Sequence, residues 1–394
     1  MDTVGRSKID FNFRRIYNAD LLIIAGEHSG DQHAAEMVRG LKKAKPDLRI
    51  AAFGGKALSD SGADLLFDMT SFSVVGLYEV VKNFLFFSKL LKSIFFWIKE
   101  CSPKAVCFVD YPGFNLRLAQ ALFDNKIANK AGGNTKLLYY ISPQIWAWKP
   151  RRKYQMAKII DELATIFPFE EQYFNNTDLK VTFVGHPFVN NGYMSNITYG
   201  KHDPILLCPG SRKGAIKKIF PELLESMSFI LKNIPDTMAV VPYPDDKTLH
   251  FLRKLLIKDF REISKNVTFV HSSSNISASA VVMSSGTMSL KCCLAGIPGA
   301  IVYKIHPFTY LIGRILVNVK YLGIANILLQ KNIWKEFLQT RCKPALISKF
   351  IIQCLENEKL ITMFQNASDD LKKILSQTAK MTACDWALSA MQAN

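Results

Sequence analysis

"LLIIAGEHSGDQHAAEMVRGLKK", residues 21–43, contains the pattern that the rest of the chain repeats. Four apolar residues lead into Ala25 and Gly26, a turn of small and acidic residues follows, and a helical pattern comes next. This order predicts a buried strand, a glycine turn and a helix, with polar groups at the carboxyl end of the strand. Such a turn either holds a phosphate or only reverses the chain.

Apolar runs alternate with helical patterns along all 394 residues. The predicted strands are 21–26, 50–53, 105–110, 137–141, 164–167, 181–184, 204–208, 238–242, 267–270, 281–284 and 299–303. This alternation indicates parallel sheets covered by helices on both faces. It restarts after 186–204, a stretch rich in Asn, Gly and Pro that is typical of a linker.

The fold class predicted from this pattern is α/β, with two Rossmann-like, doubly wound domains and a cleft between them. The domains are expected at 20–190 and 203–346. A loose extension, 1–19, precedes them, and helices, 347–394, follow them.

The net charge of +17 indicates either a solvated lysine-rich surface or an acidic partner, nucleic acid or an anionic membrane. No nucleic-acid motif occurs, so no nucleic-acid partner is expected. The eight cysteines form no CxxC pair and the histidines no HExxH, so neither a disulfide frame nor a metal site is predicted. No run of about 18 apolar residues predicts a membrane-spanning helix.

Two stretches at predicted strand ends could bind an anion. In "PILLCPGSRKGAIKKIF", 204–220, a glycine permits close backbone approach and an arginine offers a fork of donors that suits phosphate. In "VVMSSGTMSLKCCLAGIP", 281–298, hydroxyls and N–H groups meet at a helix start. A surface turn and an ordinary helix cap are the alternatives. The candidate binding residues are Gly210, Ser211, Arg212, Ser285, Gly286, Thr287 and Ser289.

Asp110 ends the predicted strand in "AVCFVDYPGFNLRLAQAL", 105–122. At this place it could take a proton from an attacking hydroxyl, provided that its surroundings raise its pKa. The alternative is a cap on the following helix. Further on, "YYISPQIWAWKPRRKY", 139–154, interleaves aromatic and basic residues. Those residues could bind a sugar face, a base or a phosphate, or could form the edge of the core.

The stretch "VGLYEVVKNFLFFSKLLKSIFFWIKE", 75–100, predicts a helix with a narrow basic stripe and a very wide apolar one. The basic stripe consists of Lys82, Lys89, Lys92 and Lys99. This pattern fits a helix in the membrane interface, and the alternative is a central helix covered by protein. The residues predicted to contact the membrane are Phe84, Phe87, Leu91, Phe95 and Ile98.

Nine stretches, in this order, resemble the lipid-A-disaccharide synthases. They are "AGEHSGD" (25–31), "VVGLYEVV" (74–81), "DYPGFNLRLA" (110–119), "YISPQIWAWKPRR" (140–152), "FPFE" (167–170), "FVGHPF" (183–188), "PGSR" (209–212), "SGTMSL" (285–290) and "YLGIANILLQ" (321–330). The resemblance implies a GT-B glycosyltransferase that joins UDP-2,3-diacylglucosamine to 2,3-diacylglucosamine 1-phosphate (lipid X). Inversion at C1 would give a β-1,6-linked disaccharide 1-phosphate and UDP.

The resemblance also assigns roles. Asp110 would be the base, and Arg212 with 285–287 would hold the UDP diphosphate, close to Asn326. The acceptor side of the cleft would be formed by Gly26, Glu27, Ser29, Gly30, Asp31 and Asn115. The enzyme would need no cofactor or metal and would act in the cytoplasm of Gram-negative bacteria, peripherally on the inner face of the inner membrane. A homodimer is compatible with the sequence.

Two positions depart from the family pattern. Lys291 and Ala215 stand where the family usually has Glu. In the GT-B plan the first of these accepts hydrogen bonds from the ribose hydroxyls, and a charged lysine only donates. Two alternatives therefore stay open: a membrane-attached GT-B binding protein with an impaired donor site, and a UDP-sugar epimerase.

Overall fold

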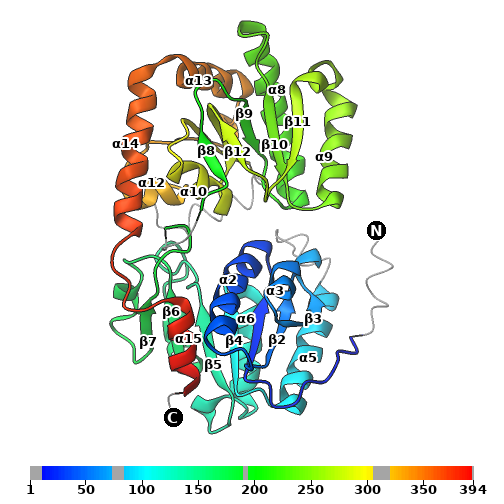
Figure 1. Cartoon of the computed structure of the whole chain (residues 1–394), viewed down its shortest axis with the longest axis vertical. Helices are drawn as coiled ribbons and strands as arrows, with labels where there is room; N and C mark the ends of the chain where they lie inside the picture. The colour runs from blue at the N-terminus through cyan, green and yellow to red at the C-terminus, as the bar shows by residue number, and fades with distance from the viewer. Residues whose placement is uncertain (1–10, 73–83, 190–193, 305–319, 393–394) are drawn as a thin grey trace. The chain divides into compact units, whose positions relative to one another are not determined.

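The computed structural model describes residues 11–72, 84–189, 194–304 and 320–392, which form two compact units. Unit 1 comprises Met1–Pro187 and Ser376–Asn394, and unit 2 comprises Phe188–Leu375. Each unit has a parallel sheet with helices packed against it (Figure 1). The stretch 74–81 and Lys82 lie outside the described residues, as does the side chain of Phe84.

The sheet of unit 1 has seven strands in the order β3-β2-β1-β4-β5-β6-β7. Their bounds are β1 (Leu21–Ala25), β2 (Ile50–Gly54), β3 (Asp64–Asp68), β4 (Ala105–Val109), β5 (Lys136–Tyr140), β6 (Glu162–Thr165) and β7 (Lys180–Phe183). The helices are α2 (His28–Ala44), α3 (Lys56–Asp60), α5 (Phe84–Cys101), α6 (Pro112–Asp124), α7 (Arg152–Ile159) and α15 (Ala383–Gln392). The strand order reverses between β1 and β4, which makes this pair the topological switch point.

The sheet of unit 2 repeats the plan with six strands in the order β11-β10-β9-β13-β14-β15. Their bounds are β9 (Ile205–Cys208), β10 (Ala239–Tyr243), β11 (Val267–His271), β13 (Ala280–Ser284), β14 (Gly299–Tyr303) and β15 (Lys335–Leu338), and β8 (Ile197–Tyr199) pairs separately with β12 (Ile276–Ala278). The helices are α8 (Lys213–Asn233), α9 (Asp246–Asp259), α10 (Thr287–Leu294), α12 (Ile324–Leu329), α13 (Pro344–Glu356) and α14 (Glu358–Leu375). Here the switch point lies between β9 and β13.

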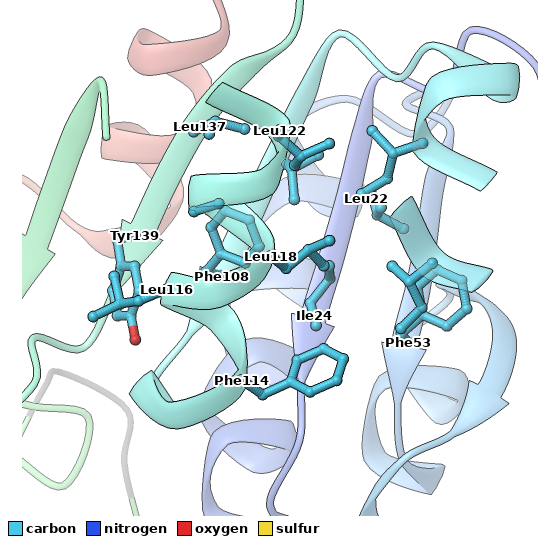
Figure 2. Close-up of a cluster of buried hydrophobic side chains, with 14 of the residues drawn as sticks. Leu22, Ile24, Phe53, Phe108, Phe114, Leu116, Leu118, Leu122, Leu137 and Tyr139 are labelled. Carbon is cyan, nitrogen blue, oxygen red and sulfur yellow. The ribbon is translucent and has the colours of Figure 1, made fainter. Parts of the chain in front are cut away.

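The core of unit 1 explains why its central strands are apolar throughout. All five residues of β1 and of β4 are buried, because helices cover both faces of the sheet. Figure 2 shows side chains of α6, among them Phe114 and Leu118, meeting Phe108 and Ile24 of the sheet. These contacts fix α6, and therefore the turn that joins it to β4.

All eleven predicted strands are present, with ends shifted by two residues at most. The sequence analysis missed β3 and β15, which are short edge strands that contain charged residues and lack a continuous apolar run. It also missed the three-residue strands β8 and β12, of which β8 lies inside the predicted linker.

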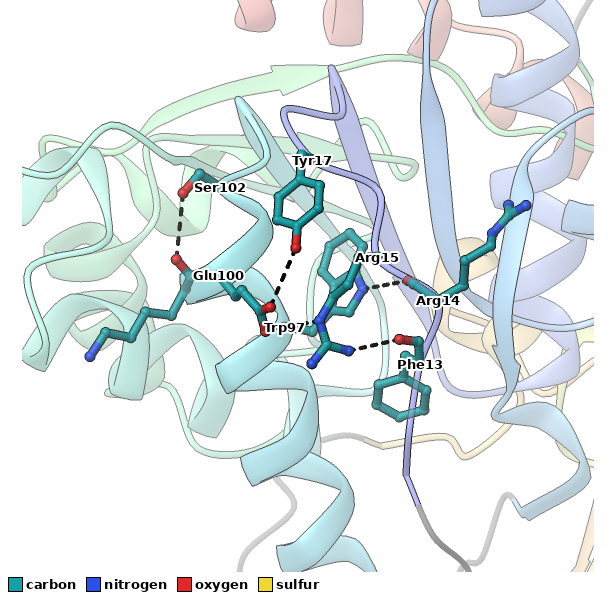
Figure 3. A network of polar contacts seen from close by, with 8 residues as sticks. Phe13, Arg14, Arg15, Tyr17, Trp97, Glu100 and Ser102 are labelled. Carbon is teal, nitrogen blue, oxygen red and sulfur yellow. Dashed lines mark hydrogen bonds and ion pairs between the residues drawn. The ribbon is translucent and has the colours of Figure 1, made fainter.

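The segment before β1 is packed, although its sequence predicts a loose extension. Trp97 Nε1 on α5 donates to the carbonyl of Arg14 at 2.9 Å, and Arg15 Nε donates to Glu100 at 2.9 Å (Figure 3). Phe13 lies edge-on to Phe53 of β2, with 4.8 Å between ring centroids. Residues 11–19 therefore contact both α5 and the sheet and connect the two.

The helices at the end of the chain divide between the two units. α13 and α14 belong to unit 2, whereas α15 packs against α2 and β6 of unit 1. Trp386 of α15 is 1% exposed and faces Tyr140 of β5, and Lys136 Nζ donates to the carbonyl of Ala390 at 3.1 Å.

Candidate active site

Apart from Asn326 on α12 and the predicted membrane residues on α5, the predicted functional residues follow the four strands that form the two switch points. In unit 1, β1 leads into 26–31 and β4 into Asp110; in unit 2, β9 leads into 209–212 and β13 into 285–287. Doubly wound sheets bind their ligands outside the carboxyl ends of strands at such a point. Each unit thus places two of the candidate loops side by side.

Hydrogen bonds to its backbone groups hold Asp110 in place. Its N–H donates to the carbonyl of Tyr140 at 3.0 Å, and its carbonyl accepts from the Tyr139 hydroxyl at 2.7 Å and from Asn115 Nδ2 at 2.8 Å. Its φ of 46° is left-handed, an uncommon conformation for a residue with a side chain. Tyr111, not Asp110, stands at the N-cap of α6, so the geometry does not support a capping role for Asp110.

Gly26 lets the β1 and β4 loops approach closely. A Cβ at this position would lie 2.3 Å from the ring of Tyr111, so any side chain would displace that ring. Tyr111 also stacks on Phe114 at 6.1 Å. Gly26, directly after β1, therefore permits close packing of the loop that carries Asp110.

The six residues predicted for the acceptor side fall into two groups. Glu27 and Ser29 are partly exposed, whereas Gly26, Gly30, Asp31 and Asn115 are buried. Asp31 Oδ1 accepts from the N–H of Gly55 at 2.7 Å, and Oδ2 accepts from that of Ala57 at 3.0 Å. Burial raises the pKa of Asp31, although these hydrogen bonds oppose the shift. The buried four pack within unit 1, and Glu27 and Ser29 are the partly exposed members of the set.

In unit 2 the first predicted anion loop lies close to the end of β13, from which the second begins. Gly210 has φ +94°, and a Cβ there would lie 3.0 Å from Ser284 Oγ at the end of β13. Arg212 lies close enough to Tyr303, at the end of β14, for its positive charge to oppose the rise that burial causes in the pKa of that tyrosine. Arg212 and the start of α10 therefore belong to one edge of one sheet.

A partly buried hydrogen-bond network supports the second anion loop. Ser285 Oγ donates to the carbonyl of Leu322 at 3.4 Å, and the N–H of Leu322 donates to Glu336 at 3.0 Å. Asn326, 0% exposed, donates to Glu336 at 3.0 Å. The side chain of Asn326 is thus occupied by hydrogen bonds to Glu336 and to the carbonyl of Trp334. Sequence reasoning missed Glu336, which lies on the unrecognised edge strand β15.

Ser289 and Lys291 lie on α10. Ser289 is buried, and its hydroxyl donates to the carbonyl of Gly286 at 2.6 Å, so it fixes the turn before the helix. Lys291 places Nζ 5.0 Å from the centre of the Phe188 ring, and burial lowers its pKa.

Two buried titratable residues, Glu170 and His186, follow β6 and β7. The sequence analysis gave neither of them a role. Glu170 accepts from Trp146 Nε1 at 3.3 Å and from the N–H of Phe167 at 3.2 Å. Burial raises the pKa of Glu170 to about 8, and the charge of Asp110 adds to the rise. His186 lies 5.3 Å from the Phe167 ring, and burial lowers its pKa to about 3. Near neutral pH both groups are mainly uncharged.

Helix α5 corrects the predicted membrane contact. Ile98 is fully buried in the core, so the prediction that it touches a membrane is wrong. Phe87, Leu91 and Phe95 are partly buried and pack against the same core. The exposed stripe consists instead of Leu85, Lys89, Lys92, Phe96 and Lys99, at spacings of four and three residues. Leu85 and Phe96, which the sequence analysis did not select, are 76% and 60% exposed.

Within the described ranges, no helix combines the length and the apolar character that crossing a bilayer requires.

Solved structures with the same fold define the class of protein. The UDP-GlcNAc 2-epimerase from Neisseria meningitidis, bound to UDP-GlcNAc, matches 90% of this chain and 98% of its own, with TM-score 0.54 and 11% identity. The glycotransferase of kitacinnamycin matches 94% of this chain and 97% of its own, with TM-score 0.55 and 10% identity. The predicted fold class is confirmed: the chain has the GT-B fold, with two Rossmann-like domains.

Closer relatives define the family. A family model described as lipid-A-disaccharide synthetase matches residues 21–391. Lipid-A-disaccharide synthase 1 of Legionella pneumophila (strain Philadelphia 1) is 35% identical over 391 residues, which cover 95% of this chain and 94% of the relative. The lipid-A-disaccharide synthase of Coxiella burnetii (strain RSA 331) is 33% identical over 349 residues, covering 86% and 90%.

The chain belongs to the lipid-A-disaccharide synthase family, and it is a glycosyltransferase of lipid A biosynthesis. The resemblance seen in the sequence is thereby confirmed. The GT-B fold alone is shared with epimerases, so it is the family membership that favours the transferase over the epimerase.

Proposed function

We propose that this protein condenses UDP-2,3-diacylglucosamine with 2,3-diacylglucosamine 1-phosphate. The acceptor 6-hydroxyl attacks C1 of the donor, the bond from C1 to the UDP oxygen breaks, and the configuration at C1 inverts. The products are the β-1,6-linked disaccharide 1-phosphate and UDP. The observation that carries the proposal is the placement of Asp110 and of the anion loops at the switch points of two sheets, in a chain of this family.

Unit 2 holds the UDP diphosphate in this proposal. Arg212 supplies a planar fork of donors, and the first N–H groups of α10 supply the positive end of a helix dipole. Both stabilise the charge that develops on the leaving UDP. The contact between Gly210 and Ser284 supports a single diphosphate site, because it brings the two loops together.

Unit 1 holds the acceptor, with Asp110 as the base. Three hydrogen bonds fix the backbone of Asp110, from which the carboxylate side chain extends. The proton acceptor is therefore positioned before the substrate arrives. Glu27 and Ser29, partly exposed after β1, are the polar groups beside it. The proton of the 6-hydroxyl passes to Asp110 as the new glycosidic bond forms.

The stripe of α5 docks on the inner face of the inner membrane, where both acylated substrates reside. Leu85 and Phe96 would enter the interface, while Lys89, Lys92 and Lys99 would pair with anionic headgroups. The alternation of apolar and basic residues along one exposed face supports this docking.

The direct test is the formation of radiolabelled disaccharide 1-phosphate from the two lipid precursors, with UDP release measured in parallel. Equal amounts of both products support the proposal. UDP release without disaccharide, or conversion of the donor sugar to an epimer, would contradict it. A calorimetric titration with UDP addresses the rival binding protein, which Lys291 and Ala215 favour: undetectable UDP binding would overturn the transferase proposal.

A further inference from the structure

Arg152, the first residue of α7, has a guanidinium nitrogen that no residue in the described part of the chain pairs. Its Nη1 atom is buried and has no hydrogen-bond partner among the residues that the structure describes. Burial lowers the pKa of its guanidinium, and the partly opposing influence comes from Tyr139. Arg152 as a whole is partly exposed, but buried polar atoms such as Nη1 are nearly always paired in native proteins. A ligand with hydrogen-bond acceptors, such as an anion, would pair this nitrogen.

The surroundings of Arg152 connect it to the candidate base. Tyr139 is fully buried, and both Arg152 and Asp110 influence its pKa, which burial raises. Its hydroxyl donates to the carbonyl of Asp110 at 2.7 Å. Tyr139 is thus close enough to Arg152 for their charges to interact, and it contacts the backbone of Asp110 directly.

A second cation lies beside the first. Lys149 Nζ is 4.5 Å and Arg152 Cζ 5.2 Å from the centre of the Trp148 ring. The ring of Trp148 attracts both cations, so two positive charges lie around one side chain. An anion bound near both would offset the repulsion between them.

We propose that Arg152, assisted by Lys149, binds the phosphate on C1 of the acceptor sugar. The inference rests on the proposed function, which gives the acceptor such a phosphate and assigns Asp110 to its 6-hydroxyl. In a pyranose ring, C1 and C5 are both bonded to the ring oxygen, so the phosphate and the 6-hydroxyl flank one edge of the sugar. A phosphate-binding group must therefore lie within about one sugar of the base. The planar guanidinium fork suits a phosphate better than a point charge does.

The kinetic test pairs two acceptors with three variants. The acceptors are 2,3-diacylglucosamine 1-phosphate and the same lipid with a free C1 hydroxyl. The variants are Arg152→Gln, Arg152→Lys and, as a matched control, Arg151→Gln at the exposed neighbouring position. Loss of the charge-assisted hydrogen bonds should raise the KM for the phosphorylated acceptor about 10- to 100-fold in Arg152→Gln. Arg152→Lys should recover part of this loss, and Arg151→Gln should behave like the wild type.

The two substrates separate binding from a merely structural effect. With the dephosphorylated acceptor, wild type and Arg152→Gln should differ less than about threefold, because the interaction is already missing. The KM for the donor should not change. Equal losses with both acceptors, or a fall in kcat alone, would overturn the proposal. The Tm of Arg152→Gln should equal or exceed that of the wild type, since the change removes an unpaired charge, and a clear fall in Tm would also contradict it.

A binding measurement distinguishes failure of this inference from failure of the proposed function. Glucosamine 1-phosphate and glucosamine are titrated calorimetrically into wild type and Arg152→Gln. Binding of glucosamine 1-phosphate that is lost in the variant, with no binding of glucosamine, supports the phosphate site even if no disaccharide forms. Disaccharide synthesis by wild type with unchanged glucosamine 1-phosphate binding in the variant would overturn the phosphate site alone.

Discussion

At the scale of single residues, Asp110 lies in a conformation that its side chain does not favour. Its φ is 46° and that of Tyr111 is 48°, so two consecutive residues lie in the left-handed region. Such a conformation costs of order 1–3 kcal/mol and persists where the surroundings enforce it. Here the hydrogen bonds from Tyr139 and Asn115 to the carbonyl of Asp110 supply part of that enforcement.

Asp110→Asn is therefore the substitution that isolates the role of the carboxylate. Asparagine tolerates the left-handed region well and keeps the size of the side chain, so the backbone contacts should survive. We expect turnover to fall by about 100-fold or more, which is within the range of general-base catalysis. UDP affinity and Tm should stay close to the wild-type values. Near-normal disaccharide formation by Asp110→Asn would remove Asp110 from the role of base.

Glu170 should make stability depend on pH. Burial raises its pKa from 4.5 to about 8, so the folded state holds the proton more tightly than the unfolded state. Its contribution to the free energy of unfolding is full below pH 4.5 and is lost as the pH rises towards 8, by at most about 1.4 kcal/mol per pH unit.

Denaturant unfolding of wild type and Glu170→Gln between pH 5 and pH 8 would check this sign. The variant should lose stability at pH 5, because an amide accepts fewer hydrogen bonds, yet its stability should fall less with rising pH. The control is Glu356→Gln at an exposed position on α13, which should reproduce the wild-type slope. A slope in Glu170→Gln equal to that of the wild type would contradict the prediction.

At the scale of elements, α5 shows what periodicity can and cannot predict. The apolar residues of this helix were correctly recognised, but the pattern does not say which element covers each of them. Ile98 faces the core, and Trp97 is covered partly by the segment around Arg14, which the sequence predicted to be loose. Other parts of unit 1 therefore cover most of the wide apolar stripe. Leu85 and Phe96 are the large apolar side chains of α5, among those described, that remain exposed.

The same limit applies to the strands and to the site. Buried central strands were predicted because both of their faces are apolar, whereas β3 and β15 combine apolar residues with charged ones at a sheet edge. The sequence placed Asp110 and Arg212 correctly at strand ends. It could not show that Asp31 caps α3 or that Asn326 holds Glu336, because those contacts join segments whose meeting depends on the whole fold.

The exposed stripe of α5 predicts which substitutions would weaken binding to a membrane. Replacing both Leu85 and Phe96 with Ser removes the two apolar side chains of the stripe, and vesicle binding should weaken about 10-fold or more. Tm should change little, since both side chains are exposed. Flotation with vesicles containing anionic lipid measures the binding. The control is Ile257→Ser, at a 59% exposed position on α9. Unchanged flotation of the double variant would contradict docking through α5.

At the scale of the whole molecule, the chain completes unit 1 only at its end. α15 follows all of unit 2 in sequence, yet it packs on α2 of unit 1. A Cβ on Gly40 would lie 3.1 Å from Cys384 Cβ, so the glycine in α2 permits this close approach. Stability of unit 1 thus depends on residues that follow unit 2 in the sequence.

Trp386 allows this dependence to be measured. Trp386→Ala should lower the free energy of unfolding of unit 1 by about 3–5 kcal/mol, which is typical of truncating a buried tryptophan. Hydrogen exchange should then show lost protection in α2, β5 and β6, while β13 and β14 of unit 2 keep theirs. In Trp386→Phe the ring contact with Tyr140 remains, and the buried Nε1, which has no hydrogen-bond partner among the described residues, is removed. That variant should therefore lose far less stability. If both units lost protection equally in Trp386→Ala, they would unfold as one cooperative body, and α15 would be stabilising the whole chain and not unit 1 alone.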